Sequence, residues 1–170
     1  MNAVSTAYRH LIHGLAVIGA AILAGVLAGI VVDVSLRTVG LQPLQWYSAL
    51  AEYSMLFATM LGGPWLVRVR GHVAVESLML AMPPSLRLVS GKFAYALCIL
   101  LSLLFVWYGG EKAISAFLSG EIDIRSIDMP RWVLYASFPL GFGLMAVEFL
   151  RYLLGFDSYY SGQAGASESL

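Results

Sequence analysis

The sequence predicts an all-α membrane protein with four transmembrane helices, short interfacial amphipathic helices and both termini in the cytoplasm. Hydrophobic residues make up 59% of the 170 residues and charged residues only 12%. Soluble domains average about 25% charged residues, so a water-soluble fold could not cover its surface with this supply. A helix needs about 20 mostly apolar residues to cross the hydrocarbon core. Four stretches approach or exceed that length: residues 11–32, 49–67, 93–110 and 132–147.

The first stretch is predicted to be a retained membrane helix. Residues 14–32 are nineteen uncharged residues in a row, whereas the apolar region of a signal peptide spans about 7–15 residues. Gly25 and Gly29, with Ala21 before them, form a ridge of small residues on this helix. Such a ridge seats either a partner helix or another span of the same chain, and the sequence leaves both possibilities open.

Tryptophan residues mark the ends of the other spans, because their rings prefer the membrane–water interface. Trp46 and Trp65 bracket the second stretch over twenty residues, which is about 29 Å of helix. Trp107 closes the third stretch and Trp132 opens the fourth. These four residues are the predicted interfacial anchors.

The connecting segments carry further structure. Over residues 75–82 the apolar residues recur at helical spacing, which predicts a short helix in the headgroup plane. Pro84 suits the first turn of the next helix. The third helix is expected to continue through Gly109 and Gly110 as an arm, followed by a polar outer loop over residues 120–129. Residues 1–155 are predicted to form one domain, and residues 156–170 a flexible tail.

Orientation follows from lysine and arginine, which are retained in the cytoplasm. With the N-terminus inside, six basic residues are cytoplasmic and four face outward, and most acidic residues fall at the outer ends. The cytoplasmic set is Arg9, Arg68, Arg70, Arg87, Lys92 and Arg151; the outward set is Arg37, Lys112, Arg125 and Arg131.

Two acidic residues near the spans invite interpretation. Glu52 is the only formal charge within the four apolar stretches, and an ionisable group in a membrane is a functional candidate by default. It pairs with a basic residue such as Arg37 or one on a partner, makes a subunit contact, or couples a proton or ion. Glu148 and Arg151 are three residues apart and are expected to form a local pair.

Several function classes find no support. The zero net charge gives no electrostatic footprint for nucleic acid. The run from Gly141 to Ala146 matches a dinucleotide pattern but lacks a preceding strand and a βαβ unit. The three histidines have no acidic or cysteine cluster to complete a metal site, and Cys98 is interpreted as a small buried apolar residue. No enzyme, cofactor or metal site is therefore predicted.

The order of local motifs carries a family resemblance over residues 10–152. Trp46-x5-Glu52-Tyr53 opens the second span, and the cassette Arg68-Val-Arg70-Gly-His72-Val-Ala-Val-Glu76 follows it. Later, Met129-Pro130-Arg131-Trp132-x2-Tyr135 leads into Pro139-x-Gly141-Phe142-x2-Met145. This run resembles the DctQ-like small membrane subunit of TRAP (tripartite ATP-independent periplasmic) transporters. Glu76 departs from the family pattern, where an aspartate commonly ends the cassette.

The resemblance implies a scaffold in the bacterial inner membrane. Such transporters import organic acids, C4-dicarboxylates or sialic acid among them, on a sodium gradient. A periplasmic binding protein captures the substrate, and a large multi-span subunit carries the substrate and sodium sites. The small subunit packs along the large one, helps dock the binding protein, contacts lipid and contributes no substrate ligand. The candidate interface residues are Glu52, Arg68, Arg70, His72, Glu76, Arg125, Asp128, Gly25 and Gly29.

Rival interpretations remain open at the level of sequence. A small homodimeric proton-coupled exporter would need an acid deep in a span, and Glu52 lies near the end of one. The same bundle of apolar helices would also be expected of a membrane anchor or assembly factor of another complex. A membrane enzyme would need convergent polar residues, which the spans do not show.

Overall fold

A computed structural model describes residues 3–42, 44–69 and 83–154, with the side chains of residues 3–5 and 84–88 left out of the description. The described chain forms α1 (Ala3–Thr38), α2 (Tyr47–Arg68), α4 (Pro84–Ser119) and α5 (Arg131–Leu153). Between α4 and α5 lies an antiparallel hairpin of β1 (Ile122–Asp123) and β2 (Met129–Pro130). This hairpin occupies the segment for which the sequence predicted a loop.

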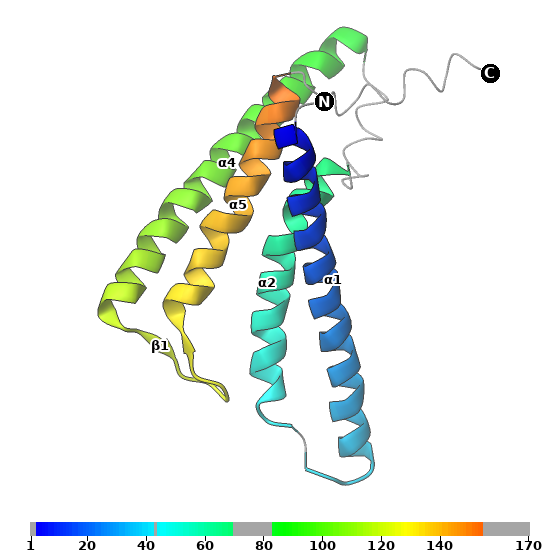
Figure 1. Cartoon of the computed structure of the whole chain (residues 1–170), viewed down its shortest axis with the longest axis vertical. Helices are drawn as coiled ribbons and strands as arrows, with labels where there is room; N and C mark the ends of the chain where they lie inside the picture. Colours follow the sequence, from blue (N-terminus) through cyan, green and yellow to red (C-terminus); the bar gives the residue numbers. More distant parts are fainter. Residues whose placement is uncertain (1–2, 43, 70–82, 155–170) are drawn as a thin grey trace, which may run out of the picture.

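The four helices lie side by side in one row rather than in a compact bundle (Figure 1). The order along the row is α4, α5, α2, α1, because α4 packs mainly on α5, α5 also packs on α2, and α2 packs on α1. The start of α1, the end of α2, the start of α4 and the end of α5 share one end of the row, here called the N-terminal end. The opposite end, which carries β1 and β2, is called the hairpin end.

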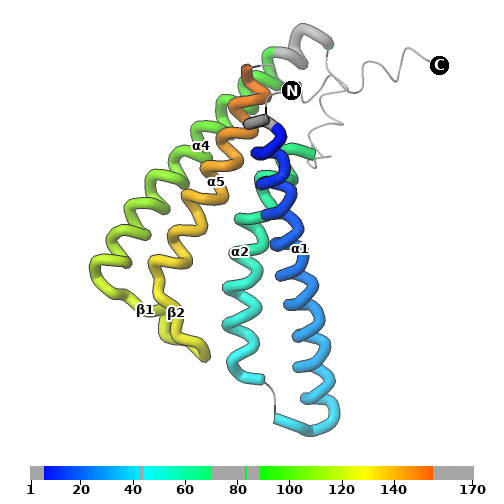
Figure 2. The backbone as a smooth tube through the Cα atoms, in the orientation of Figure 1, coloured from blue at the N-terminus to red at the C-terminus, as the bar shows by residue number. Residues whose placement is uncertain are grey.

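The row consists of two helix pairs that separate toward the hairpin end (Figure 2). The pairs α4/α5 and α1/α2 meet at the N-terminal end, and the hairpin reaches across the space between them toward the start of α2. Among the described residues, no second layer covers either face of the row. Many large apolar side chains are consequently exposed, for example Leu27, Leu100 and Leu140.

Within the described residues, three helices are long and apolar enough to cross a membrane. They are Thr6–Thr38 in α1, Val89–Ser119 in α4 and Arg131–Leu153, which is all of α5. The fourth predicted span, α2, does not reach this level of hydropathy. It is 22 residues long, but its sequence includes Glu52, Pro64 and two glycines, which lower the mean.

The ends of the helices follow ordinary stereochemical rules. Pro84 occupies the first turn of α4, as predicted, since proline needs no N–H partner there. The helix then runs unbroken through Gly109 and Gly110, which confirms that the helix continues beyond the predicted span. It ends at Gly120, whose φ of 65° lies in the left-handed region that glycine adopts at low cost. The predicted helix over residues 75–82 and the predicted tail lie outside the described residues.

Glycines allow the helices to approach closely where they cross. A Cβ added at Gly141 of α5 would lie 2.9 Å from the backbone oxygen of Met60 of α2, and one at Gly19 of α1 would lie 3.0 Å from that of Ala58. A Cβ at Gly29 would collide with the ring of Tyr47. Gly29 therefore packs against α2 of its own chain, whereas Gly25 has open space around it.

The close contact at Gly141 makes a testable prediction. Gly141→Ala should lower the free energy of unfolding by about 1–3 kcal/mol, because the added methyl group meets backbone that cannot move aside. Gly143→Ala is the matched control, since its nearest neighbour is Val106 Cγ2 at 3.9 Å. Thermal unfolding of the detergent-solubilised chain measures both. Equal melting temperatures for the two variants would show that the α2–α5 crossing is looser than described.

Candidate interaction surfaces

Charged side chains at the hairpin end join the hairpin to α2. The Arg125 guanidinium pairs with the carboxylate of Glu52, and its Nε lies 3.1 Å from Asp123 Oδ2. The Tyr53 hydroxyl donates to the same Asp123 oxygen at 2.8 Å. Arg131 bonds Glu121 at 3.2 Å and approaches Asp123 Oδ1 at 3.9 Å. We call these six residues the hairpin cluster: Glu52, Tyr53, Glu121, Asp123, Arg125 and Arg131.

Asp123 is the central residue of the hairpin cluster, because three side chains converge on its carboxylate. Tyr53 is buried, whereas the Glu52 side chain is 61% exposed. The carboxylates of Glu52 and Asp123 raise the pKa of the Arg125 guanidinium above its ordinary value, so Arg125 stays charged. The cluster therefore presents fixed charges to water while it holds the hairpin against the start of α2.

The α1–α2 connection is fixed by Asp33. Its carboxylate accepts from Arg37 Nε at 2.9 Å and from the backbone N–H of Leu44 at 2.8 Å. The Tyr47 hydroxyl donates to the Val26 carbonyl oxygen at 2.7 Å. These bonds fold the connection back onto α1 and set the depth at which α2 starts along it.

A buried carboxylate, Glu148, joins the two helix pairs at the N-terminal end. It is only 1% exposed and lies 3.4 Å from Arg68 Nη1 of α2 and 3.2 Å from Arg151 Nη1 of its own helix. Both guanidinium groups also lie over the ring of Tyr8 of α1, at 6.0 and 5.8 Å from its centroid. These four residues, from three helices, are called the Glu148 cluster.

Tyr152 reinforces this end of the row. Its hydroxyl donates to the Arg68 carbonyl oxygen at 2.9 Å, which satisfies one of the carbonyls left over at the end of α2. Its ring stacks on Tyr95 of α4 with centroids 5.8 Å apart. Val67, Tyr95 and Tyr152 form a buried apolar core beside the Glu148 cluster.

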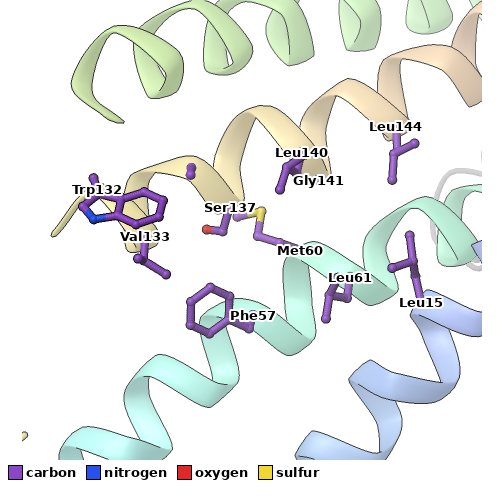
Figure 3. A pocket seen from close by; sticks show the side chains of 11 residues that line it. Leu15, Phe57, Met60, Leu61, Trp132, Val133, Ser137, Leu140, Gly141 and Leu144 are labelled. Carbon is purple, nitrogen blue, oxygen red and sulfur yellow. The ribbon is translucent and has the colours of Figure 1, made fainter. Parts of the chain in front are cut away.

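Between the clusters, α2 and α5 border an apolar groove of about 330 Å³. Phe57 of α2 lies opposite Val133 of α5, and Met60 lies beside Ser137 and Gly141 (Figure 3). Leu61 lies toward the other end of the groove, with Leu15 of α1 (Figure 3). Its one polar side chain, Ser137, donates to the backbone oxygen of Leu134. The residues that line the groove are therefore suited to contact with an apolar group, and none of them is charged.

Comparison with known protein families identifies the family of this chain. The model described as "Tripartite ATP-independent periplasmic transporters, DctQ component" matches residues 26–156, well over half of the chain. The chain belongs to the DctQ family. No curated protein and no solved structure matches it closely. The family match confirms the resemblance that the motifs indicated. The chain is therefore the small membrane component of a TRAP transporter.

In the DctQ chain some of the predicted ion pairs are present, and other charged residues have different partners. Glu52 pairs with Arg125 rather than with Arg37. Arg37 instead pairs with Asp33, which lies one helical turn before it on α1. Glu148 and Arg151 form the predicted local pair, and Arg68 of α2 shares the carboxylate as a further partner that the sequence did not indicate. Asp128 is exposed on the hairpin. Arg70, His72 and Glu76 lie outside the described residues.

Three of the four predicted anchors of this DctQ chain lie near helix ends, and Trp107 does not. Trp46 precedes the first residue of α2, Trp65 lies in its last turn, and Trp132 is the second residue of α5. Trp107 is 73% exposed and lies within α4, because the helix continues for twelve residues beyond it. Among the described residues, no group of three or more histidine, cysteine or acidic residues could hold a metal ion.

Proposed function

We propose that the chain is the scaffold subunit of a sodium-gradient-driven, binding-protein-dependent importer of organic acids in the bacterial inner membrane. In this proposal it packs along the large transport subunit, and its hairpin end faces the periplasm and helps dock the binding protein. Membership in the DctQ family supports the coarse role, since such components work with a large subunit and a binding protein. The finer role is argued from the shape and the surfaces of the chain.

The observation that carries the scaffold role is the single row of helices. A row without a second layer cannot enclose a solute path, but it offers two broad apolar faces to lipid and to a membrane partner. On α4 alone, Phe93, Leu100 and Leu103 are more than half exposed. Contiguous apolar surface of this extent marks a site of protein or membrane interaction.

We propose that α2 is the fourth span although its composition is less apolar. Its start lies beside Val26 of α1 through Tyr47, and its middle lies beside Gly19 through Ala58. It therefore runs at the same depth as the most apolar part of α1. Some of its small and polar residues contact neighbouring helices or the hairpin, among them Tyr53, Ala58 and Gly63, which is consistent with its lower hydropathy.

The hairpin end is the surface we assign to the binding protein. Charged side chains stand exposed on it, and the hairpin cluster fixes their positions. Fixed charges steer a soluble partner toward its docking site and set its orientation. The basic residues placed inside by this orientation include Arg9, Arg68 and Arg151, in keeping with retention of positive charge in the cytoplasm.

The geometry favours this function over a proton-coupled exporter. A coupling acid should lie deep in a span and change its protonation state during transport. Glu52 lies in the second turn of α2, its side chain is mostly exposed, and it pairs with Arg125, so it is not an acid held deep in a span. Glu148 is buried, but it lies near the end of α5 between two arginines.

Affinity purification of the chain from native membranes tests the proposal. A stoichiometric many-span membrane protein should accompany it, and the purified complex should take up an organic acid into liposomes only with a sodium gradient and a binding protein. A chain that purifies alone as a stable dimer would refute the scaffold role. The transport assay separately decides the sodium dependence.

Charge reversal on the hairpin makes a second prediction. The double variant Arg125→Glu/Asp128→Arg should reduce uptake about tenfold, the lower range of electrostatic steering effects, because it repels Glu52 and inverts the docking surface. Co-purification of the large subunit should be unchanged. The control is Glu111→Lys/Lys112→Glu, which exchanges the same charge types at exposed positions of α4. Uptake that survives the hairpin variant would exclude this surface from docking.

A further inference from the structure

A pocket lined by basic residues lies at the N-terminal end between α1 and α2. Its volume is about 410 Å³. Two arginines and two histidines contribute to its wall, and among the described residues no carboxylate does; the lining residues are Arg9, His10, His13, Trp65, Arg68 and Val69. Arg9 and both histidines are exposed. The pocket is therefore a concave cationic site with exposed basic side chains at its wall.

The Glu148 cluster holds one of these arginines in place. Arg68 lies with Nη1 3.4 Å from the Glu148 carboxylate and its guanidinium over the Tyr8 ring. A guanidinium has five N–H donors, so this contact leaves several for a second anion. Glu148 also pairs with Arg151, so the two arginines retain one positive charge in excess, to which Arg9 adds another. The site is preorganised for a negatively charged group.

An apolar groove continues from this pocket along the same two helices. Its volume is about 460 Å³, and it shares His13 and Trp65 with the pocket. The rest of its lining carries no formal charge and includes Ala16, Val17, Gly19, Ala20, Leu23, Ala58, Thr59, Gly62, Gly63 and Leu66. From His13 to Leu23 it extends about 15 Å along α1, which is half of the roughly 30 Å hydrocarbon core. That length corresponds to one leaflet.

We propose that the pocket and the groove together bind one anionic phospholipid. The headgroup phosphate lies between Arg9 and Arg68, and an acyl chain lies in the groove between α1 and α2. Trp65 lies where the two meet, at the depth where an indole ring prefers the headgroup boundary. Basic pockets between membrane helices bind anionic headgroups through the same charge complementarity. This site is independent of the scaffold role, since its lining comes from α1 and α2 and its arginine Arg68 is held by Glu148 of the same chain.

Native mass spectrometry of the full-length chain, purified with its partners, tests the proposal. The protein is equilibrated with phosphatidylglycerol or with phosphatidylethanolamine, and the retained lipid is counted. Arg9→Gln should weaken phosphatidylglycerol retention about fivefold, as expected for one basic residue near the surface. Lys92→Gln, which removes the same charge from an exposed position on α4, should leave it unchanged.

The groove is tested by filling it. A Cβ added at Gly62 meets no atom within 4 Å, so Gly62→Leu should fold normally and occupy the space of the acyl chain, reducing retention at least fivefold. Ala20→Leu fills the groove from the opposite wall. Gly14→Leu is the matched control, because Gly14 also has open space and lies outside both cavities. Melting temperatures confirm that each variant is folded.

The outcomes separate the possible occupants. Loss of phosphatidylglycerol with Arg9→Gln and with both groove variants supports the site. Loss with Arg9→Gln alone means that the pocket binds a phosphate group without an acyl chain, and it overturns the proposal. If the groove variants expel the large subunit while lipid retention stays constant, a protein helix fills the groove. Equal retention of the two lipids also overturns the proposal.

Discussion

Glu148→Gln is expected to lower the free energy of unfolding by about 3–5 kcal/mol, the range for breaking a buried ion pair from one side. The variant leaves Arg68 and Arg151 facing each other over Tyr8 without the carboxylate that neutralises them. It also removes the main polar link between the two helix pairs. Denaturation of the purified chain by heat and by SDS measures the loss.

The control for Glu148 is Glu121→Gln in the hairpin cluster. Glu121 pairs with Arg131 at 3.2 Å, but both side chains are more than two-fifths exposed, and exposed pairs contribute about 0–1 kcal/mol. A second test replaces the whole buried group, because apolar residues of similar volume often restore stability. Glu148→Met with Arg68→Met and Arg151→Met should recover much of the loss. A Glu148→Gln variant as stable as the Glu121→Gln variant would refute this account.

Asp123→Ala is expected to release the hairpin from α2. The substitution removes the acceptor shared by Tyr53 and Arg125 and the nearby charge facing Arg131. A hydrogen bond to a charged group contributes about 1.5–3 kcal/mol, so amides of residues 121–130 should exchange with deuterium about 10–100 times faster. Hydrogen-exchange mass spectrometry reads this segment directly.

Asp128→Ala provides the matched control for Asp123. It removes the same carboxylate from the same hairpin, but at an exposed position, and exchange over residues 121–130 should stay within about twofold of the parent, as for a surface substitution. If docking needs a fixed hairpin, binding-protein-dependent uptake should fall for Asp123→Ala while the large subunit still co-purifies. Unchanged exchange in Asp123→Ala would show that Glu52 and Arg125 alone hold the hairpin.

The helices were predictable because apolar runs of this length and the flanking tryptophans specify membrane segments directly. The unbroken α4 followed from the absence of a strong breaker between Pro84 and Gly120. The composition of α2 was a poorer guide, since a helix that packs on both sides carries glycines and polar residues where an isolated span carries leucine. The arrangement of the helices in one row had no local sequence signal.

The partners of the charged residues were harder to predict because they are distant in sequence. Arg68 and Glu148 are 80 residues apart, and Arg125 and Glu52 are 73 apart. One signal was present and missed: Asp33 and Arg37 stand four residues apart on α1, a spacing that favours a helical ion pair and therefore removes Arg37 as a partner for Glu52. The burial of Glu148 depends on three helices meeting, which no local pattern encodes.

The row order also bears on how the chain assembles. The helices of each pair are neighbours in sequence, joined by residues 39–46 in one pair and by residues 120–130 in the other, so each pair closes at a small entropic cost. The α2–α5 seam instead unites residues some 80 positions apart. We therefore expect each pair to form as a helical hairpin first and the seam between α2 and α5 to form last. Because the pairs diverge from this seam toward the hairpin end, we expect the row to bend along it.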